Sequence, residues 1–345
     1  MKRKTSKRSA VELGRIAHEL KKKGWFKDAE EKYYELLAMD SKNVYAMVGL
    51  GDLKRLKKHF AEAADYYLRC LQIDRDNWHA LAGLGDAFRG MKDLDKALEV
   101  WYRCLEIRPG ELKIVTRVAD ALRKKGDFPN ARRYYSIALD RNPYDPYALM
   151  GLGVLAIEER NDEEALGHFK KHLEISEDSI IPLTSSANIY RKRKAFQKAI
   201  DLYEKVLALD PRNSHAWHGK ADCLRGMERH LSAIKAWTMA LENGMNPRVG
   251  LARIGDAYVS LNNLDLAEAS YRKAMAVGYD KYAYLGISKI HVRKDDFDKA
   301  SEVLSMLLHK EPEDPRVASE TRQLIEKYPQ IKRTKYLWNG VNPLA

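Results

Sequence analysis

The chain has 345 residues, of which 45% are hydrophobic and 32% charged, and its formal net charge is +12. No apolar run approaches the ~20 residues that a membrane-spanning helix needs, which argues against membrane insertion. The basic N-terminus runs directly into a charged segment, so we expect no export signal. Three cysteines without paired spacing, Cys70, Cys104 and Cys223, favour a cytoplasmic protein that lacks disulfides and zinc.

A period of 34 residues runs through most of the chain. Alanine recurs at this spacing from Ala29 to Ala267, and once more after 33 residues at Ala300. An aromatic residue stands four positions after each alanine, with Leu304 in the last case, and a small residue stands twelve positions before it. Three registers kept through nine repeats predict a repeat architecture.

Each repeat shows apolar residues at the spacing of a helix face, interrupted by a short polar turn, and so predicts two consecutive helices. The small residues are expected where helix backbones approach closely, with the aromatic ring filling the wider gap beside them. Aspartate and asparagine in the turns are able to cap the second helix. Proline follows the end of that helix in four repeats, at Pro109, Pro143, Pro211 and Pro312.

A helix–turn–helix of this length, with Leu-Gly, aromatic, alanine and terminal proline at these offsets, resembles the tetratricopeptide-repeat family. The resemblance implies an all-α, right-handed superhelical solenoid of about nine repeats over residues 10–314, after a basic extension over residues 1–9. The repeats begin at Ala10, Val44, Trp78, Leu112, Pro146, Ile180, Ser214, Arg248 and Lys281. The repeat pattern weakens around residues 176–186, where we expect a softer joint between two halves.

The end of the array differs from the repeats. Asp314 and Pro315 are typical of a helix start, and Pro329 stops the apolar face that follows. We therefore expect a single capping helix over residues 315–328, which covers the last open face of the solenoid.

A basic tail over residues 329–345 follows, with Tyr336, Leu337 and Trp338 in it. We expect this tail to pack on the last two repeats, or to reach a second copy of the chain and mediate self-association. The apolar positions expected to receive it are Val259, Tyr282, Leu285 and Val292.

The resemblance also implies that partners bind on a concave face lined by the first helix of each repeat. On that face, aspartate is followed three residues later by arginine, which places both side chains on one side of a helix. This Asp/Arg ladder consists of Asp52, Arg55, Asp86, Arg89, Asp120, Arg123, Asp222 and Arg225, with Asn188 and Arg191 as its equivalent in repeat six. Two interpretations stay open: salt bridges between neighbouring repeats, or a polar track for an extended peptide.

The ladder is interrupted in repeat five by an apolar stripe at the same positions, formed by Tyr147, Met150, Val154 and Ile157. Repeats eight and nine carry a partial equivalent at Val249, Val259, Tyr282, Leu285 and Val292. An apolar patch within a polar groove is the expected form of a binding hot spot. The alternative is that local geometry buries these side chains.

Two other groups of residues have both a structural and a functional interpretation. Basic residues at the ends of the first helices complement the helix dipole, or form a rim that attracts polyanions such as RNA. This rim comprises Lys21–Lys23, Arg55, Lys57, Lys58, Arg123–Lys125 and Arg191–Lys194. A metal site is conceivable at His215, His218 and Asp222, which share one side of a helix but lack a fourth ligand.

Some family members hold a C-terminal carboxylate in a clamp of lysine and asparagine side chains. Lys113 and Arg117 match that clamp, but Val48, Asp52 and Gly83 stand where it needs lysine or asparagine. An aspartate in this position would repel a carboxylate, so we do not expect this chain to bind C-terminal carboxylates in that way.

No glycine-rich phosphate loop, nucleophile motif or separate catalytic domain remains outside the repeats. The sequence therefore predicts a non-catalytic scaffold or adaptor, without cofactor, that binds a peptide segment or a partner protein in its groove. The alternatives are a solenoid that binds RNA or another polyanion through its basic rim, and an accessory subunit of an enzyme complex.

Overall fold

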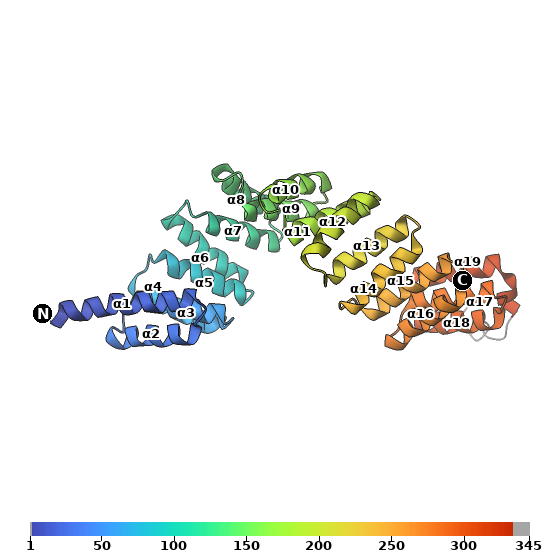
Figure 1. Cartoon of the computed structure of the whole chain (residues 1–345), viewed down its shortest axis with the longest axis horizontal. Helices are drawn as coiled ribbons and strands as arrows, with labels where there is room; N and C mark the ends of the chain where they lie inside the picture. Colours follow the sequence, from blue (N-terminus) through green and yellow to red (C-terminus); the bar gives the residue numbers. More distant parts are fainter. Residues whose placement is uncertain (1, 334–345) are drawn as a thin grey trace. The chain divides into compact units, whose positions relative to one another are not determined.

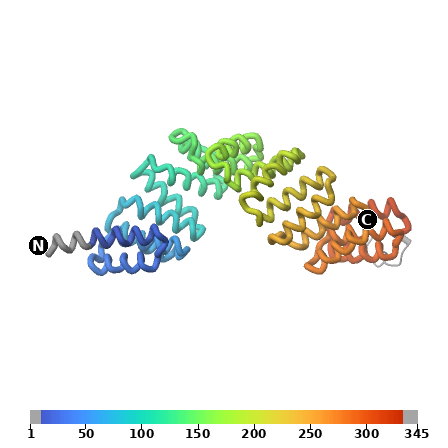
Figure 2. Tube along the Cα trace, viewed as in Figure 1, coloured from blue at the N-terminus to red at the C-terminus, as the bar shows by residue number. Residues whose placement is uncertain are grey.

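The computed structural model describes the backbone of residues 2–333 and the side chains of residues 10–331 (Figure 1). Nineteen α-helices and one short 3-10 helix occupy this part of the chain, and no strand occurs within it. Successive helices double back on one another as hairpins (Figure 2). The all-α architecture of paired helices predicted from the period is confirmed.

Eighteen helices form nine consecutive pairs, one for each repeat. The first unit of the chain contains α1 (Lys2–Lys22) with α2 (Phe26–Met39), α3 (Val44–Leu56) with α4 (Phe60–Ile73), α5 (Trp78–Gly90) with α6 (Leu94–Ile107), α7 (Leu112–Lys124) with α8 (Phe128–Arg141), and α9 (Pro146–Glu158) with α10 (Asp162–Ile175). The second contains α11 (Ile180–Lys192) with α12 (Phe196–Leu209), α13 (Ser214–Gly226) with α14 (His230–Glu242), α15 (Pro247–Ser260) with α16 (Leu264–Val277), and α17 (Lys281–Arg293) with α18 (Phe297–Lys310).

The two units are compact bodies, residues 1–175 with repeats one to five and residues 176–345 with repeats six to nine. The division falls at the beginning of the stretch where the sequence analysis placed a softer joint. Helix α1 begins at Lys2 and so runs through the residues that were expected to form a separate extension. No helix of the described residues is both long and apolar enough to cross a membrane.

Side-chain caps define where the helices begin. The turn residues Asp93, Asp127 and Asn263 accept hydrogen bonds from backbone N–H groups in the first turn of the second helices, as the sequence analysis expected. Asn43 and Asn77 do the same for the first helices, with N–H to oxygen distances of 2.9 and 3.0 Å. These bonds satisfy backbone donors that have no partner within the helix.

All nine turns between paired helices contain one residue in the left-handed region of backbone conformation. Glycine supplies this residue only twice, at Gly24 and Gly126, each with a φ of 81°. In the other seven repeats it is Lys58, Lys92, Arg160, Lys194, Glu228, Asn262 or Asp295. Most of the turns thus place a non-glycine residue in a backbone conformation that is energetically unfavourable for it.

The core is built from the repeated alanine and the aromatic residue that follows it. Ala63 and Tyr67, for example, are both completely buried. The tyrosine ring lies against the next first helix at Gly83, where an added methyl group would lie 2.7 Å from the Tyr67 hydroxyl oxygen. Gly151 receives Tyr135 in the same way. Glycine at this position therefore lets the tyrosine pass between two first helices.

The capping helix is present as α19 (Pro315–Lys327), and Asp314 caps it by accepting the N–H groups of Arg316 and Val317. A 3-10 helix over Pro329–Arg333 follows, and Ile331 within it is completely buried together with Val317 and Ile325. Tyr336, Leu337 and Trp338 lie outside the described residues, so packing and self-association through this part of the tail remain predictions.

Candidate binding groove

The surface formed by the first helices of a unit is called its first-helix face here. On this face of the first unit, the Asp/Arg ladder makes ion pairs between neighbouring repeats. Lys21 Nζ donates to Asp52 at 2.7 Å, Arg55 lies 3.5 Å from Asp86 of the next repeat, and Arg123 donates to Glu158 at 2.5 Å. Pairs within one repeat, such as Arg123 with Asp120 at 2.9 Å, add to these contacts. Much of the ladder is therefore engaged in links within the array.

In repeats two, six and eight the aromatic residue is tyrosine, and its hydroxyl donates to the aspartate or asparagine at the same position of the first helix. Tyr67 donates to Asp52 at 2.8 Å and Tyr271 donates to Asp256 at 2.7 Å. The amide oxygen of Asn188 accepts from Tyr203 at 2.8 Å. In these repeats the tyrosine hydroxyl, a neutral donor, hydrogen-bonds the carboxylate or amide oxygen from the core side. That oxygen therefore depends less on neighbouring cations for its hydrogen bonds.

Repeat three departs from this arrangement because its aromatic residue is Trp101. Asp86 therefore has no tyrosine partner, and three guanidinium groups surround its carboxylate: Arg117 at 3.1 Å, Arg89 at 3.2 Å and Arg55 at 3.5 Å. We call these four residues the Asp86 cluster. The Asp86 side chain is only 4% exposed, whereas the arginines keep about a third of their surface in solvent: 28%, 37% and 30% in the same order.

Arg117 occupies the position that glycine takes elsewhere. Gly83, Gly151 and Gly219 each follow a repeat with tyrosine, whereas Arg117 follows Trp101 and Arg253 follows Trp237. Without a tyrosine hydroxyl passing through, a long side chain fits between the helices. Consistently, α5 and α7 are less closely apposed than α3 and α5 or α7 and α9. Sequence analysis missed this role, although the pairing of Trp with Arg was visible in it.

Burial and charge act together on Arg117. Burial lowers the pKa of its guanidinium, and repulsion from Arg89 and Arg55 adds to this effect, while Asp86 opposes it. The cluster is thus a place where positive charge is only partly compensated within the protein.

The apolar stripe of repeat five borders the same region. A pocket of about 490 Å³ has Arg89, Lys113, Arg117 and Arg123 among its lining residues, with Tyr147, Met150 and Val154 of α9 on the other wall. Tyr147 is 71% exposed, and Met150 and Val154 are partly exposed. Ile157 is partly exposed as well but does not line the pocket. Local geometry therefore does not bury the stripe.

The second unit has a pocket of about 520 Å³ on its own first-helix face, and Val249, Val259 and Tyr282 are among the residues that line it. Leu285 and Val292 differ from expectation, since they are only 2% and 3% exposed. Both belong to an apolar core that also contains Val317 of α19 and Ile331, a residue of the expected tail, and Leu285 is among the residues that line the pocket. The packing of Tyr336, Leu337 and Trp338 on these residues stays a prediction.

The residues considered for a metal site form an arginine cluster instead. Asp222 is bound by Arg191 at 2.7 Å and lies 3.5 Å from Arg225 and 3.6 Å from His218. Burial lowers the pKa of His218; Asp222 opposes this effect, and repulsion from Arg191, Arg253 and Arg225 adds to it.

His215 is exposed and does not join this group. No set of three metal-ligating side chains occurs among the described residues, and the surrounding guanidinium groups would repel a cation. The suggestion of a metal site at His215, His218 and Asp222 is thus not supported.

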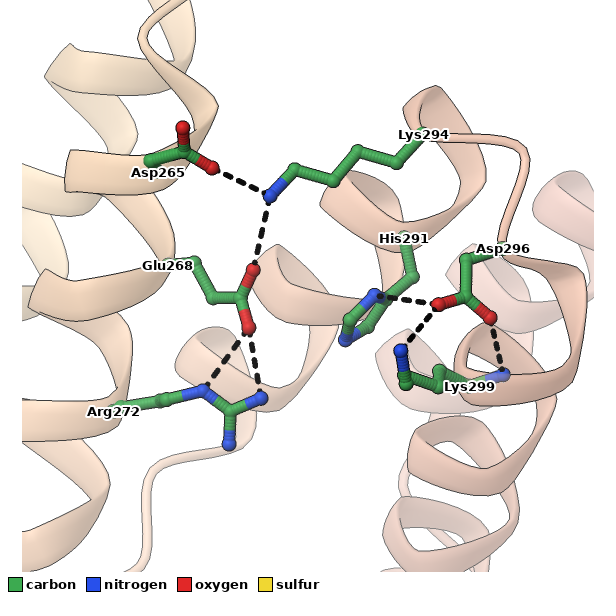
Figure 3. Close-up of polar contacts among 7 residues, drawn as sticks. All are labelled: Asp265, Glu268, Arg272, His291, Lys294, Asp296 and Lys299. Atoms are coloured by element: carbon green, nitrogen blue, oxygen red, sulfur yellow. Dashed lines mark hydrogen bonds and ion pairs between the residues drawn. The ribbon is translucent and has the colours of Figure 1, made fainter.

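Rim lysines pair with acids on the second helix of the preceding repeat. Lys57 donates to Glu30 at 2.6 Å, and Lys125 pairs with Asp95. Figure 3 shows the equivalent contact in the second unit, where Lys294 reaches Asp265 at 2.7 Å and Glu268 at 3.3 Å. These contacts reduce the positive charge that the rim presents to a polyanion.

The three cysteines are free thiols in the core, as the sequence analysis expected for Cys70 and Cys104. Burial raises the pKa of Cys70 and of Cys223 to about 11. Burial also raises the pKa of Cys104, which lies 3.7 Å from the Trp78 carbonyl oxygen. None of them has the exposed thiolate character of a nucleophile.

Comparison with known proteins places this geometry in a family. Sequence models of the tetratricopeptide repeat match residues 15–77, 117–180, 183–216 and 250–277, together more than half of the chain. One curated relative is subunit 3 of the anaphase-promoting complex of Schizosaccharomyces pombe, 30% identical over 87 residues. That segment spans 25% of this chain and only 13% of the subunit.

Solved structures share the fold at low sequence identity. A tetratricopeptide repeat protein from Parabacteroides merdae has a TM-score of 0.51 at 15% identity, covering 71% of this chain and 97% of its own. PilW, a type IV pilus biogenesis factor, has a TM-score of 0.56 at 18% identity, covering 60% of this chain and 96% of its own. The Cut9–Hcn1 assembly of the anaphase-promoting complex has a TM-score of 0.50 at 14% identity, covering 86% of this chain and 58% of its own. On the repeat pattern, the paired helices and these matches, the chain belongs to the tetratricopeptide-repeat family.

Proposed function

We propose that this chain is a non-catalytic scaffold that binds an extended segment of a partner protein on the first-helix face of its first unit. Proteins of the tetratricopeptide-repeat family generally mediate protein–protein interactions, and a scaffold role agrees with that. We extend the proposal to a cytoplasmic setting, in keeping with the reduced, buried thiols of Cys70, Cys104 and Cys223.

The observation that carries the proposal is the exposed apolar stripe in the pocket beside the Asp86 cluster. Tyr147 leaves 71% of its surface in water. Burial of one large side chain contributes about 1.5–3 kcal/mol. Tyr147, Met150 and Val154 together therefore offer a partner side chain a substantial apolar anchor, surrounded by polar groups that give orientation.

The comparisons add support for assembly rather than catalysis. One curated relative, 30% identical over 87 residues, is a subunit of the anaphase-promoting complex. A role as a subunit that holds other proteins together is consistent with that likeness. The rim, in contrast, gives less support to the alternative of polyanion binding, since Lys57 and Lys125 are already paired with carboxylates.

The proposal is tested by selecting binders from a random peptide display library with the full chain. We expect selected peptides to lose binding to the double variant Tyr147→Ala/Met150→Ala. They should retain it with Tyr144→Ala/Met91→Ala, which removes the same side chains at exposed positions of the same unit outside the pocket. If no peptide is enriched, or if both double variants bind equally, the proposed site is wrong.

A further inference from the structure

The Asp86 cluster lies at the edge of the proposed groove and has more cations than its own carboxylate neutralises. We infer that it binds an acidic side chain of the partner segment, an aspartate or a glutamate within the chain of that partner. This inference rests on the proposed function, because it specifies the chemistry of the segment that occupies the same pocket.

Charge balance is the first argument. One carboxylate, Asp86, lies within 3.1–3.5 Å of Arg117, Arg89 and Arg55, and Arg55 is shared with Asp52 at 3.5 Å, so the cluster keeps an excess of at least one positive charge. Lys113, which is exposed and lines the same pocket, adds another, whereas Asp120 of the same lining is already paired with Arg123 and Lys124. The arginines are partly withdrawn from water, which strengthens their attraction for an anion compared with lysines on an open surface.

Hydrogen-bond donors along the pocket wall are the second argument. Arg89 and Arg117 line the pocket, and each contacts Asp86 through Nη2 while 37% and 28% of the two side chains stay exposed. A guanidinium group has five N–H donors, so donors remain for a ligand. A carboxylate accepts them in pairs, so it suits this wall of the pocket better than a neutral amide does.

The position of the apolar stripe sets the spacing within the ligand. The cations come from α5 and α7, which are first helices of repeats three and four. The stripe comes from α9, the first helix of repeat five and the neighbour of α7. Neighbouring helices lie about 8–10 Å apart, and an extended chain advances about 3.3 Å per residue. The segment should therefore carry its acidic residue about three positions away from its apolar anchor.

The cluster favours a side-chain carboxylate over a chain terminus. A C-terminal carboxylate in this family is held by polar groups at the positions of Val48, Asp52 and Gly83, and here these offer no donor and one negative charge. Asp52 is also already bound to Lys21 and Tyr67. An internal acid needs only the donors that face the pocket.

The chain itself suggests a variant that removes the cluster without damaging the core. Trp101→Tyr/Arg117→Gly recreates in repeats three and four the tyrosine–glycine pair seen at Tyr67 and Gly83. The new tyrosine also supplies Asp86 with the hydroxyl donor that Asp52 receives from Tyr67. A matched control is Trp237→Tyr/Arg253→Gly, the same exchange in the second unit. Circular dichroism establishes that both variants keep their helices.

The probe is a set of short fluorescein-labelled peptides with blocked ends, tested with the full chain by fluorescence anisotropy. One peptide carries glutamate three residues from leucine, a second has glutamine instead, and a third has alanine instead of leucine. A fourth has glutamine with a free C-terminal carboxylate. We expect the glutamate peptide to bind about tenfold more tightly than the glutamine peptide, as one charge-assisted hydrogen-bonded pair allows. This preference should weaken as salt concentration rises.

In Trp101→Tyr/Arg117→Gly the preference for glutamate should disappear while the leucine still contributes, and the control variant should behave like the parent chain. Equal binding of the glutamate and glutamine peptides to the parent, or a preference that survives in Trp101→Tyr/Arg117→Gly, would overturn the inference and leave the proposed function intact. Tightest binding by the free-carboxylate peptide would also overturn it, in favour of a chain terminus. If no peptide binds, the proposed function falls and the inference with it.

Discussion

A single aromatic residue in each repeat determines what the groove presents. Tyrosine sends its hydroxyl toward the first-helix face, as Tyr67 does to Asp52, and requires glycine at Gly83 on the next helix. Tryptophan at Trp101 does neither, so Arg117 occupies that position and the carboxylate of Asp86 gathers arginines. A core residue thereby sets the charge of a surface that it does not itself line.

The turn residues allow a second test at the residue scale. Lys92 has a φ of 65°, and replacing it by glycine removes the penalty that a side chain incurs there. Because glycine also gives the unfolded chain more freedom, we expect Lys92→Gly to raise the free energy of unfolding by only about 0.5–1 kcal/mol. Urea unfolding followed by circular dichroism measures this.

The reverse change supplies the control for that experiment. Gly126 has a φ of 81° at the equivalent position of repeat four, with no atom near enough to touch an added methyl group. Gly126→Ala should therefore destabilise the chain by about 1 kcal/mol through backbone strain alone. If both changes shift the unfolding midpoint in the same direction, the turn conformation is not the cause.

At the scale of helices, neighbouring repeats are joined by polar contacts on both sides of the array. One example links α16 to the α17–α18 hairpin, where Glu268 and Asp265 receive Lys294 and Arg272 binds Glu268 (Figure 3). His291 of α17 lies close by and is buried, with its Nδ1 3.9 Å from Asp296. Burial has the largest effect on the pKa of this imidazole.

This histidine predicts a pH dependence of stability. Burial lowers the pKa of His291 below its usual 6.5, despite the opposing carboxylates of Glu268 and Asp296, and the Lys299 and Arg272 cations add to the lowering. The unfolded chain therefore takes up the proton first, so the free energy of unfolding should fall as the pH drops below about 6.5. His291→Gln should reduce this slope, measured by urea unfolding at a series of pH values.

His309 offers the matching control, because it lies exposed on α18 of the same unit. His309→Gln should leave the slope unchanged. An unaltered slope in His291→Gln would mean that the protonated imidazole finds enough stabilisation from Asp296 and Glu268 to offset its burial.

Helices were easier to predict than the groove, for physical reasons. Alanine and aromatic residues at fixed offsets leave one way to pack a helix pair, and caps such as Asp93 act locally, so the period revealed both. The groove depends on contacts between repeats. Leu285 has the same sequence position as a groove residue, but it is buried in an apolar core with residues of α18 and α19. In the sequence, Arg117 was noted only as a partial match to a carboxylate clamp, because its contacts with Asp86 and Arg55 come from two preceding repeats.

At the scale of the whole molecule, the chain consists of two compact units, each with its own apolar core. Trp101 with Arg117 in the first unit and Trp237 with Arg253 in the second stand four repeats apart. Each unit thus carries one arginine cluster, around Asp86 in one and Asp222 in the other.

Independent cores predict unfolding in parts. Ala165 is completely buried in α10, and Ala165→Leu should overpack the first unit at a cost of roughly 1–3 kcal/mol while the second unit keeps its helices. Thermal denaturation followed by circular dichroism should then show an early, partial loss of helix. Gly167→Leu adds bulk on the open side of the same helix and should not produce that early loss. A single transition in Ala165→Leu would show that the units unfold together.

The buried thiols have a practical consequence for observing such motions. Cys70 and Cys104 lie in repeats two and three and Cys223 in repeat seven, all fully shielded from solvent. A thiol reagent reacts with them only when their own helices separate, because the thiolate forms in water and not in the core. The reactivity of these cysteines therefore reports local opening of the helices in each unit. Slower alkylation of Cys104, with Cys223 unaffected, would register a ligand seated near the Asp86 cluster without any label on the protein.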